Sequence, residues 1–582
     1  MTVPTTANAQ ATFCATLVDE WIRDGVQHAY IAPGSRSTPM ALALSARAEI
    51  TVEVFIDERC AAFAALGAGK ATGLPAVALC TSGTAATHFS AAVTEASLSG
   101  VPLIVCTADR PPELRDVGAA QTIDQTHLYG SAVRWFHDPG VASYDAAHTW
   151  RALANHVVAR TMSPVAGPVH LNLPFREPLL GEVVDMPPKR QHDASWSGFH
   201  AGRSQLSDWE IDDLAHRLAG RRGVIIAGDV GAGFDLATYT SAVSVLSSVL
   251  HWPILACPLS GVRGGSANIV THFDGIVRSQ SAHGALAPEV VLQLGKPPAS
   301  KVLGQWVAST HAEVIAVHGP GTYQDAQHLT YMHIEANVAN TVDRLCSVVA
   351  SVSDTREQDI SLRWNSMWSN AQVAATQSIE KVLSAVGEVS DPAIARMFGE
   401  IFSVGVVSSS MPIRDVEWFS EGKENGVLFS NRGANGIDGV ISTAIGIAQS
   451  LRSPIGVYLG DLAFLHDGTA LIGLKNRNLN LRIVVVDNSG GGIFSFLPQA
   501  TQVNKDVFEN LYGTPHGADI ALLARAHGIE VLEPKSLSEL SAAMQGSGTA
   551  VILLKTNRES NVSIHEQLHT AIASSVDAVT NS

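Results

Sequence analysis

The chain has 582 residues, of which 46% are apolar and 16% charged, too many for one hydrophobic core and enough for roughly three or four domains. Its net charge of −16 argues against nucleic acid or an anionic membrane surface as the main partner. No apolar run is long enough to span a bilayer, residues 1–13 lack the pattern of a signal peptide, and six scattered cysteines indicate buried thiols in a reducing cytoplasm.

The first segment, residues 1–186, alternates helical patterns with short apolar runs. Strands are expected at 28–31, 52–56, 76–79, 103–106 and 169–171. Polar loops follow the first four, and such strand ends are where open α/β sheets bind ligands. After the first strand, Thr38 is the expected N-cap of a helix with Pro39 as its first residue. Ser35 and Arg36 then lie before a helix N-terminus, a natural anion site.

A polar stretch at 187–204 is typical of a linker, and two further α/β segments follow it. The second segment, 187–362, has expected strands at 224–227, 254–257, 290–294 and 314–317. The third, 363–582, has expected strands at 404–408, 427–430, 455–459, 482–487 and 550–554, and its last twenty or so residues are expected to be frayed. The chain is therefore predicted to be an α/β protein with three doubly wound parallel-sheet domains.

Two strand ends of the third segment carry oxygen ligands. One strand ends in Gly460-Asp461, and the next ends in Asn488, which is followed by Ser489 and three glycines. A crossover helix, expected to run through Leu474, would make the strands parallel, with their ends about 5 Å apart if they are neighbours. A carboxylate, an amide oxygen and phosphate oxygens are typical ligands of Mg²⁺ on a diphosphate. The alternative is a strand-end Asp and an Asn-Gly turn without a ligand, which the spacing and the triple glycine disfavour.

Gly460-Asp461 and Asn488, separated by residues 462–487, resemble the thiamine-diphosphate signature of the decarboxylase and acetohydroxyacid synthase superfamily. The resemblance implies a pyrimidine-binding domain at 1–186, a central domain without cofactor at 187–362 and a diphosphate-binding domain at 363–582. It implies Mg²⁺, with Mn²⁺ as an alternative, on Asp461, Asn488 and the carbonyl of Gly490. The other implied cofactor contacts are Ser410, Gly436, Ile437, Gly460, Leu462 and Gly491, with Leu462 where many members have glycine.

The superfamily also requires a glutamate that hydrogen-bonds the pyrimidine ring of the cofactor. Glu58 follows the expected strand 52–56 and precedes a helical pattern at 61–69. A strand-end Glu is more often solvated or a charge at a helix N-terminus, but the Asp461 pattern makes Glu58 the candidate catalytic residue. Ile437 is similar to the apolar wedge that keeps the cofactor bent, and the Gly436 backbone to the acceptor of its amino group.

Segments 31–39, 107–121, 430–439 and 491–498 closely resemble the 2-succinyl-5-enolpyruvyl-6-hydroxy-3-cyclohexene-1-carboxylate (SEPHCHC) synthases of menaquinone biosynthesis. The resemblance spans essentially the whole chain but is thin in the central domain, where residues 295–301 carry it. It implies decarboxylation of 2-oxoglutarate and 1,4-addition of the succinyl carbanion to isochorismate, which gives SEPHCHC and CO2.

Both implied substrates are dianions, so an acidic protein must gather cationic side chains locally, and arginine suits planar carboxylates. For one arginine a surface salt bridge is the commoner explanation, but four at matching positions favour substrate binding. Val302, where relatives often have Arg, and Asp487, where Asn is common, depart from the pattern. The expected substrate-binding residues are Ser35, Arg36, Arg110, Gln121, Lys301, Arg414, Arg432, Ile493, Phe494 and Leu497.

In the superfamily the glutamate-bearing and metal-bearing domains meet across a subunit interface. The resemblance therefore implies at least a homodimer, commonly a homotetramer, in the cytoplasm, with neither nucleic acid nor integral membrane association. One alternative is another thiamine-diphosphate enzyme, such as an acetohydroxyacid synthase or a 2-oxoacid decarboxylase, whose acceptor would not need the arginines. Another is a catalytically inactive, nucleotide-binding regulatory protein on the same fold, which Glu58, Asp461 and Asn488 disfavour.

Overall fold

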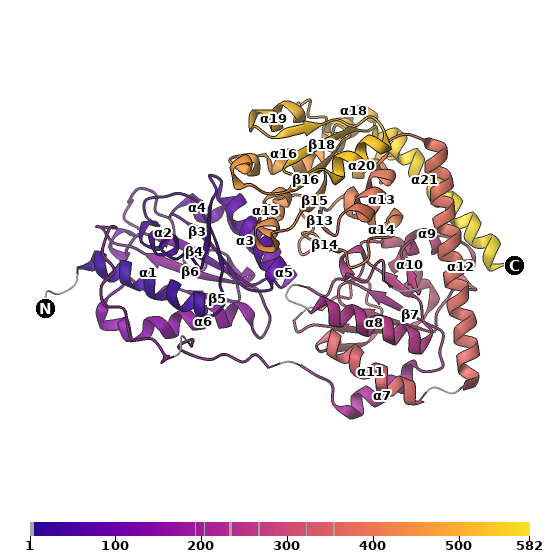
Figure 1. Cartoon of the computed structure of the whole chain (residues 1–582), viewed down its shortest axis with the longest axis horizontal. Helices are drawn as coiled ribbons and strands as arrows, with labels where there is room; N and C mark the ends of the chain where they lie inside the picture. Colours follow the sequence, from indigo (N-terminus) through magenta and orange to yellow (C-terminus); the bar gives the residue numbers. More distant parts are fainter. Residues whose placement is uncertain are drawn as a thin grey trace.

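The computed structural model describes residues 5–191, 194–202, 204–231, 235–265, 268–321, 323–352 and 355–581. These residues form three six-stranded sheets arranged one after another along the chain (Figure 1). Alternate residues of the central strands belong to different apolar clusters, as Leu103 and Ile104 do in the first sheet, so each sheet is covered on both faces. The strand pairs are parallel, which confirms the predicted fold class.

The first sheet has the strand order β2-β1-β3-β4-β6-β5. Its strands are β1 (His28–Ile31), β2 (Thr51–Val54), β3 (Ala76–Cys80), β4 (Leu103–Asp109), β5 (Trp135–His137) and β6 (Pro168–Pro174). Its helices are α1 (Thr6–Arg23), α2 (Thr38–Ser45), α3 (Glu58–Thr72), α4 (Thr84–Thr87), α5 (Ser90–Ser99) and α6 (Trp150–Met162). The N-cap of α2 is Ser37 rather than the predicted Thr38, which is already helical.

The second sheet has the order β12-β11-β10-β7-β8-β9, the order of a doubly wound nucleotide-binding fold. Its strands are β7 (Gly223–Ala227), β8 (Ile254–Ala256), β9 (Ile269–Val270), β10 (Val290–Leu294), β11 (Glu313–His318) and β12 (Thr330–Glu335). Its helices are α7 (Asp208–Leu218), α8 (Leu236–Leu250), α9 (Phe273–Ile276), α10 (Lys301–Thr310) and α11 (Val338–Val352). The described part of the expected linker 187–204, which excludes residues 192, 193 and 203, contains no helix or strand of more than one residue.

The third sheet, ordered β14-β13-β15-β16-β18-β17, repeats the strand order of the first. Its strands are β13 (Val404–Val407), β14 (Val427–Phe429), β15 (Ile455–Gly460), β16 (Leu481–Asp487), β17 (Glu530–Leu532) and β18 (Ala550–Lys555). Its longer helices are α13 (Asp391–Ile401), α14 (Met411–Phe419), α15 (Val440–Leu451), α19 (Ile520–Ala526) and α20 (Leu537–Gln545). Its short helices are α16 (Asp461–His466), α17 (Gln499–Gln502) and α18 (Lys505–Phe508). The expected crossover helix through Leu474 is wrong in part, because α16 ends at His466 and 3₁₀ turns follow.

Two long helices lie side by side at the far end of the molecule from the first sheet, α12 (Thr355–Val386) and α21 (Arg558–Thr580) (Figure 1). The prediction that the last twenty or so residues are frayed is wrong, because Leu568, Ile572 and Val576 of α21 are fully buried. The expected second domain boundary, at residue 362, falls within α12.

The first and third sheets are joined by helices α3 and α15, which pack closely against each other within one chain. A Cβ atom at Gly67 would lie 2.1 Å from the carbonyl oxygen of Thr443, and one at Gly446 would lie 1.9 Å from that of Ala64. Only glycine permits this approach at the two positions. One apolar cluster consequently extends from the first sheet into the third. No helix among the described residues has the length and apolar character to cross a membrane.

Candidate active site

Asp461 and Asn488 lie at the same edge of the third sheet. Strands β15 and β16 are parallel neighbours with Gly460 opposite Val486, as the sequence predicts. The Asp461 carboxylate is 2% exposed and accepts a hydrogen bond from the Gly490 amide at 2.8 Å. Burial raises the pKa of Asp461, and Asp487 raises it further, whereas the Gly490 and Leu462 amides lower it. A nearby cation would offset this cost of burying the charge.

Several oxygen atoms at this edge have no hydrogen-bond partner within the described chain. They include the buried Asn488 Oδ1 and the Ser408 hydroxyl after β13. Ser410, with a φ of 76°, precedes α14 without capping it through its side chain. The free amides of a helix N-terminus bind anions. The oxygen donors therefore fit a hard divalent cation, and the α14 N-terminus fits a phosphate group.

A loop that follows α18 covers the glycine turn after Asn488. Gly490 has a φ of 139°, and a Cβ atom there would lie 1.8 Å from the Gly513 carbonyl oxygen, so no other residue fits. The Gly491 amide donates to the same oxygen at 2.8 Å. This loop places His516 Nε2 at 3.3 Å from Asp461 and 3.8 Å from Asp487. Asp461, Asp487 and His516 thus form a group able to hold a metal ion, and the sequence patterns did not indicate His516.

Glu58 is the first residue of α3, which starts three residues earlier than expected. Asp57 caps the helix by accepting from the Arg59 amide at 2.9 Å. The Glu58 carboxylate lies near the end of β3. Burial raises the pKa of the Cys80 thiol there, and the nearby Glu58 carboxylate raises it further. Within the described chain no hydrogen bond or ion pair to that carboxylate is found. Its neighbours Asp57 and Arg59 contact Thr469 and His466 of the same chain, at 2.7 and 2.6 Å.

Arg36 and Arg110 lie together at the carboxyl edge of the first sheet. Burial lowers the pKa of Arg110, and the nearby Arg36 lowers it further. Arg36 is buried and donates to Phe175 O and Glu177 Oε1, both at 3.0 Å. Arg110 donates to the Ser82 hydroxyl, and Gln121 donates to the Ser82 carbonyl at 3.0 Å. Ser82, which was not among the predicted site residues, therefore joins this candidate group, and the predicted Ser35 is exposed at the same edge.

Arg414 and Arg432 form a second cationic group at the carboxyl edge of the third sheet. Burial lowers the pKa of Arg414, and Arg432 lowers it further. The second sheet contributes Lys296, whose pKa is lowered by burial and also by Arg432. The predicted Lys301 is the exposed first residue of α10. The described residues show no hydrogen bond or ion pair between this group and the Arg36–Arg110 pair.

The predicted apolar residues of the site lie beside the glycine turn after Asn488 or beside the apolar cluster that links the first and third sheets. Ile493 and Phe494 lie in a 3₁₀ turn after Gly491, and the Phe494 ring is 5.5 Å from that of Tyr512. Leu497 is 38% exposed. Ile437 packs against the cluster that links the first and third sheets, and a Cβ atom at the adjacent Gly436 would lie 2.0 Å from Asp438 Oδ1.

Comparison with known proteins identifies the family. Residues 12–128 match the thiamine pyrophosphate enzyme N-terminal TPP binding domain, and residues 418–553 match the corresponding C-terminal TPP binding domain. Relatives named 2-succinyl-5-enolpyruvyl-6-hydroxy-3-cyclohexene-1-carboxylate synthase from Bacillus pumilus, Chloroflexus aurantiacus and Geobacillus kaustophilus are 38%, 37% and 36% identical. These alignments cover 96%, 98% and 97% of this chain and 96%, 97% and 98% of the relatives. The chain therefore belongs to the SEPHCHC synthases, a family of thiamine-diphosphate enzymes.

Proposed function

We propose that the protein decarboxylates 2-oxoglutarate and adds the succinyl unit to isochorismate, which gives SEPHCHC and CO2 in menaquinone biosynthesis. The supporting observation is that one edge of the third sheet carries both an oxygen-donor pair, Asp461 and Asn488, and a guanidinium pair, Arg414 and Arg432. The first pair suits the metal of a diphosphate cofactor, and the second suits a dicarboxylate.

In this proposal the metal is Mg²⁺, held by Asp461, Asn488 Oδ1 and the carbonyl of Gly490. The orphaned Asn488 Oδ1 and the buried Asp461 carboxylate support this assignment. The α14 N-terminus, with Ser410, receives the diphosphate. Thiamine diphosphate, when bound, supplies the ring that accepts the electron pair released on decarboxylation.

The remaining residues bind and orient. Glu58 hydrogen-bonds the pyrimidine ring of the cofactor, while Ile437 supports the ring from the apolar core. Arg36 and Arg110 form one cationic group for substrate carboxylates, and Arg414 and Arg432 form the other, so each acid is fixed relative to the reacting carbon. Ile493, Phe494 and Leu497 form an apolar wall that would exclude water from the reacting centre.

The proposal extends to the organisation of the molecule. The three sheets support domains at 1–186, 187–362 and 363–582, with α12 joining the last two. We propose a homodimer at minimum, and a homotetramer by analogy with the superfamily. All six cysteines are free and buried, which supports a cytoplasmic location, since disulfides are rare there.

The test is an assay of the purified full chain with thiamine diphosphate, Mg²⁺, 2-oxoglutarate and isochorismate. Isochorismate is expected to be consumed in step with CO2 release, and removal of Mg²⁺ by a chelator should stop both. Asp461→Asn should abolish turnover, whereas Asp212→Asn, a matched change of an exposed carboxylate on α7, should not. Decarboxylation of pyruvate without consumption of isochorismate would contradict the proposal.

A further inference from the structure

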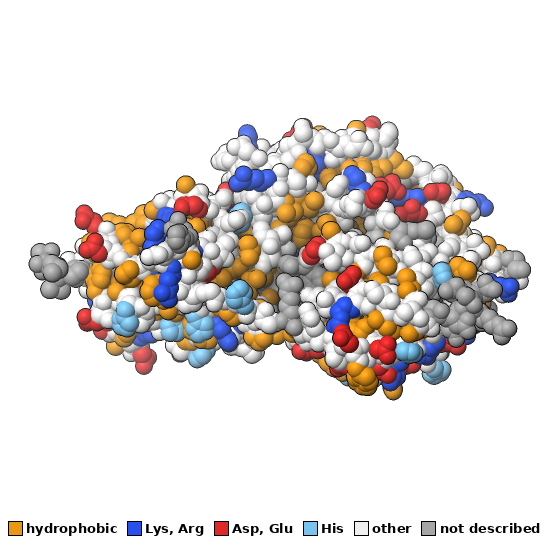
Figure 2. Space-filling model, turned by 60° about the horizontal axis from the view of Figure 1, so that its bottom comes forward, with side chains coloured by type: hydrophobic (Ala, Val, Ile, Leu, Met, Phe, Trp, Pro, Cys, Tyr) orange, Lys and Arg blue, Asp and Glu red, His pale blue; other side chains and the backbone are white. Residues whose placement is uncertain are grey.

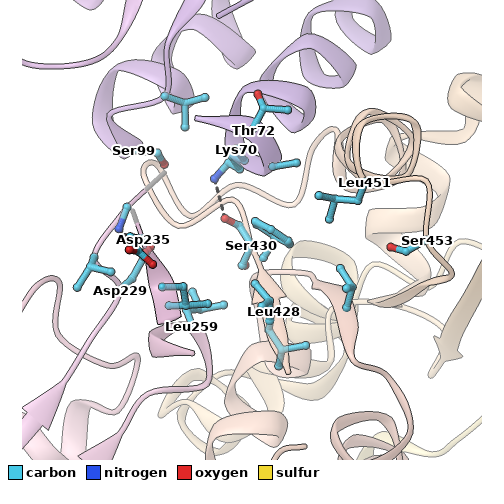
Figure 3. A pocket seen from close by; sticks show the side chains of 18 residues that line it. Lys70, Thr72, Ser99, Asp229, Asp235, Leu259, Leu428, Ser430, Leu451 and Ser453 are labelled. Carbon is cyan, nitrogen blue, oxygen red and sulfur yellow. Dashed lines mark hydrogen bonds between the residues drawn. The ribbon is translucent and has the colours of Figure 1, made fainter. Parts of the chain in front are cut away.

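A buried ion pair of the first domain holds the loop of the third domain that carries Arg432 and Ile437. Glu95 on α5 is 3% exposed, and Lys70 on α3 contacts it at 3.2 Å. Lys70 also donates to the Ser430 carbonyl at 2.8 Å, which Figure 3 shows across the gap between the two domains. Both charged groups thus reach from the first sheet toward residues 430–437, referred to below as the arginine loop.

The Glu95 carboxylate binds the backbone of the arginine loop directly. It accepts the Gly433 amide at 3.0 Å and the Ala434 amide at 2.7 Å, and it also accepts the Ser99 hydroxyl at 2.5 Å. Hydrogen bonds to a charged acceptor are about twice as strong as those between neutral groups. Burial alone would raise the pKa of Glu95, but Lys70, Ser99 and the two amides hold it below its usual value.

The sequence of the loop fits this contact closely. A Cβ atom at Gly433 would lie 2.8 Å from the backbone carbonyl oxygen of Glu95 and 2.7 Å from Ser99 Oγ, so a side chain at this position would push the loop away from α5 and from the carboxylate. On the other side of Arg432, the carbonyl of Asn431 accepts from Ser409 at 3.3 Å, and its side chain donates to Thr443 at 3.1 Å. Arg432 is thereby anchored on both sides, although no hydrogen bond to its own guanidinium is found among the described residues.

We propose that Glu95 and Lys70 are positioning residues that fix the arginine loop across the domain interface and so aim Arg432 at the substrate and Ile437 at the cofactor. The roles of Arg432 and Ile437 rest on the proposed function, whereas the anchoring of the loop does not. Neither Glu95 nor Lys70 needs to touch the reactants, because their effect reaches the site through the loop backbone.

The first test is hydrogen–deuterium exchange of the full chain in Glu95→Gln and Lys70→Met. Lys70, Ser99 and Ser430 line a cavity of about 730 Å³ between the three sheets. The shorter Met side chain in Lys70→Met therefore enlarges this cavity and does not create a new void in a packed core. In both variants, exchange within residues 430–437 should become about tenfold faster or more. Glu20→Gln is the matched control, since Glu20 is a buried carboxylate of the first domain that pairs with Arg151. It should leave exchange in the arginine loop unchanged.

Kinetics then separate positioning from simple stabilisation. Glu95→Gln and Lys70→Met should raise the KM of a dicarboxylate substrate about tenfold and change kcat less, because a displaced Arg432 weakens binding of the substrate and of the transition state alike. Lys70→Arg keeps the positive charge and the hydrogen-bond donors, so its KM should stay close to that of the wild type. Gly433→Ala should reproduce the faster exchange with Glu95 intact, and it replaces Glu95→Gln if that variant does not fold.

Unchanged exchange in the arginine loop of a folded variant, or an equal increase in Glu20→Gln, would overturn the proposal. Faster exchange with unaltered KM values would show that the ion pair anchors the loop but does not position Arg432 for the substrate. If the wild-type protein does not turn over 2-oxoglutarate and isochorismate, the proposed function fails, and the exchange measurement still decides whether the ion pair anchors the loop.

Discussion

Glu58 lies where a helix begins beside the end of a buried strand. It is the first residue of α3. It also lies near the buried Cys80 thiol at the end of β3, an environment of low polarity. Because Asp57 takes over the capping of α3, the Glu58 carboxylate is left available for a ligand.

Glu58→Gln keeps the shape of this side chain but removes its proton exchange and negative charge. If Glu58 hydrogen-bonds the pyrimidine ring, turnover should fall about a hundredfold or more, the usual contribution of a positioned acid–base group. The thermal unfolding midpoint and circular dichroism spectrum should stay close to wild type. Glu49→Gln, a change at a 53% exposed carboxylate of the same domain, is the control and should be fully active. Wild-type activity in Glu58→Gln would remove this residue from the mechanism.

The site residues that could be predicted from the sequence are those set by strand ends. Asp461 and Asn488 follow apolar runs directly, so parallel pairing of β15 and β16 suffices to bring them together. Ser82 and Lys296 also follow strand ends, those of β3 and β10, but the sequence did not single them out from the other polar residues of their loops. His516 had no such signal, because it reaches the site through a loop that is placed by tertiary contacts. His516 depends on the approach of Gly513 to Gly490, which glycine spacing alone does not reveal.

Helix α14 connects the candidate active site to the second sheet. Its N-terminus carries Ser410 and Arg414, and its C-terminal carbonyls accept hydrogen bonds from the buried Arg263, including those of Val416 at 2.9 Å and Ser420 at 2.7 Å. Glu417 on the same helix accepts the Ala299 amide at 2.9 Å. The second sheet therefore holds α14 at its far end, which gives that domain a structural role in the site.

Glu417 makes this contact dependent on pH. Burial raises its pKa from 4.5 to about 7, so the folded state binds this proton more tightly than the unfolded state does. The contribution to stability is therefore largest below about pH 4.5 and declines as the pH rises to about 7, by on the order of 3 kcal/mol. Glu417→Gln does not titrate, and its unfolding midpoint relative to wild type should rise over this range and then level off.

The measurement is the thermal midpoint of both proteins by differential scanning calorimetry between pH 4.5 and 8.5. Glu400→Gln, which changes a 49% exposed carboxylate, should show a small and nearly constant difference. A pH-independent difference for Glu417→Gln would show that Glu417 ionises normally in the folded protein.

Helix α21 stabilises the far end of the molecule. Ile572 is fully buried against α9, where its side chain contacts Gly275. Ile572→Ala should cost about 2–5 kcal/mol in unfolding free energy, since the rigid surroundings would leave a cavity. Val579→Ala, at a 39% exposed position of the same helix, should cost much less. Urea unfolding followed by tryptophan fluorescence measures both, and equal midpoints would mean that α21 is not a core element.

The strands that the sequence did not predict are short or lack a clear apolar pattern. The edge strands β5, β9 and β17 have two or three residues each, and β12 is half exposed with a register irregularity beside β11. Central strands such as β10 and β16 are mostly apolar and buried, which the sequence indicates well. The polar composition of α21 concealed a narrow buried stripe spaced four residues apart, at Leu568, Ile572 and Val576.

On the scale of the whole molecule, the first and third sheets behave as a matched pair. They have the same strand order, and the corresponding helices α3 and α15 pack against each other. Apolar side chains gather over the middle of the face shown in Figure 2. Near Glu58, the exposed residues include Val54 at 53% and Ile56 at 68%. An apolar surface beside a candidate catalytic residue suits contact with a second copy of the chain.

The arrangement of the site within the oligomer can be tested by combining two inactive variants. Glu58→Gln is expected to lower turnover at least about a hundredfold, and Asp461→Asn is expected to abolish it. If a site combines Glu58 of one copy with Asp461 of another, a hybrid dimer has one altered site with both changes and one intact site. Such a hybrid, co-expressed with two different tags and purified over both, should regain about half of the wild-type activity.

A site built within one chain predicts a different result, because every site of the hybrid then contains one of the two changes. The hybrid would be inactive, and the contacts of Asp57 and Arg59 with Thr469 and His466 in the same chain would mark the functional arrangement. A hybrid of wild type and Glu58→Gln calibrates the assay, since both arrangements give it about half of the wild-type activity. Restored activity in the first hybrid would show that the catalytic unit is a pair of chains, because neither parent variant has an intact site.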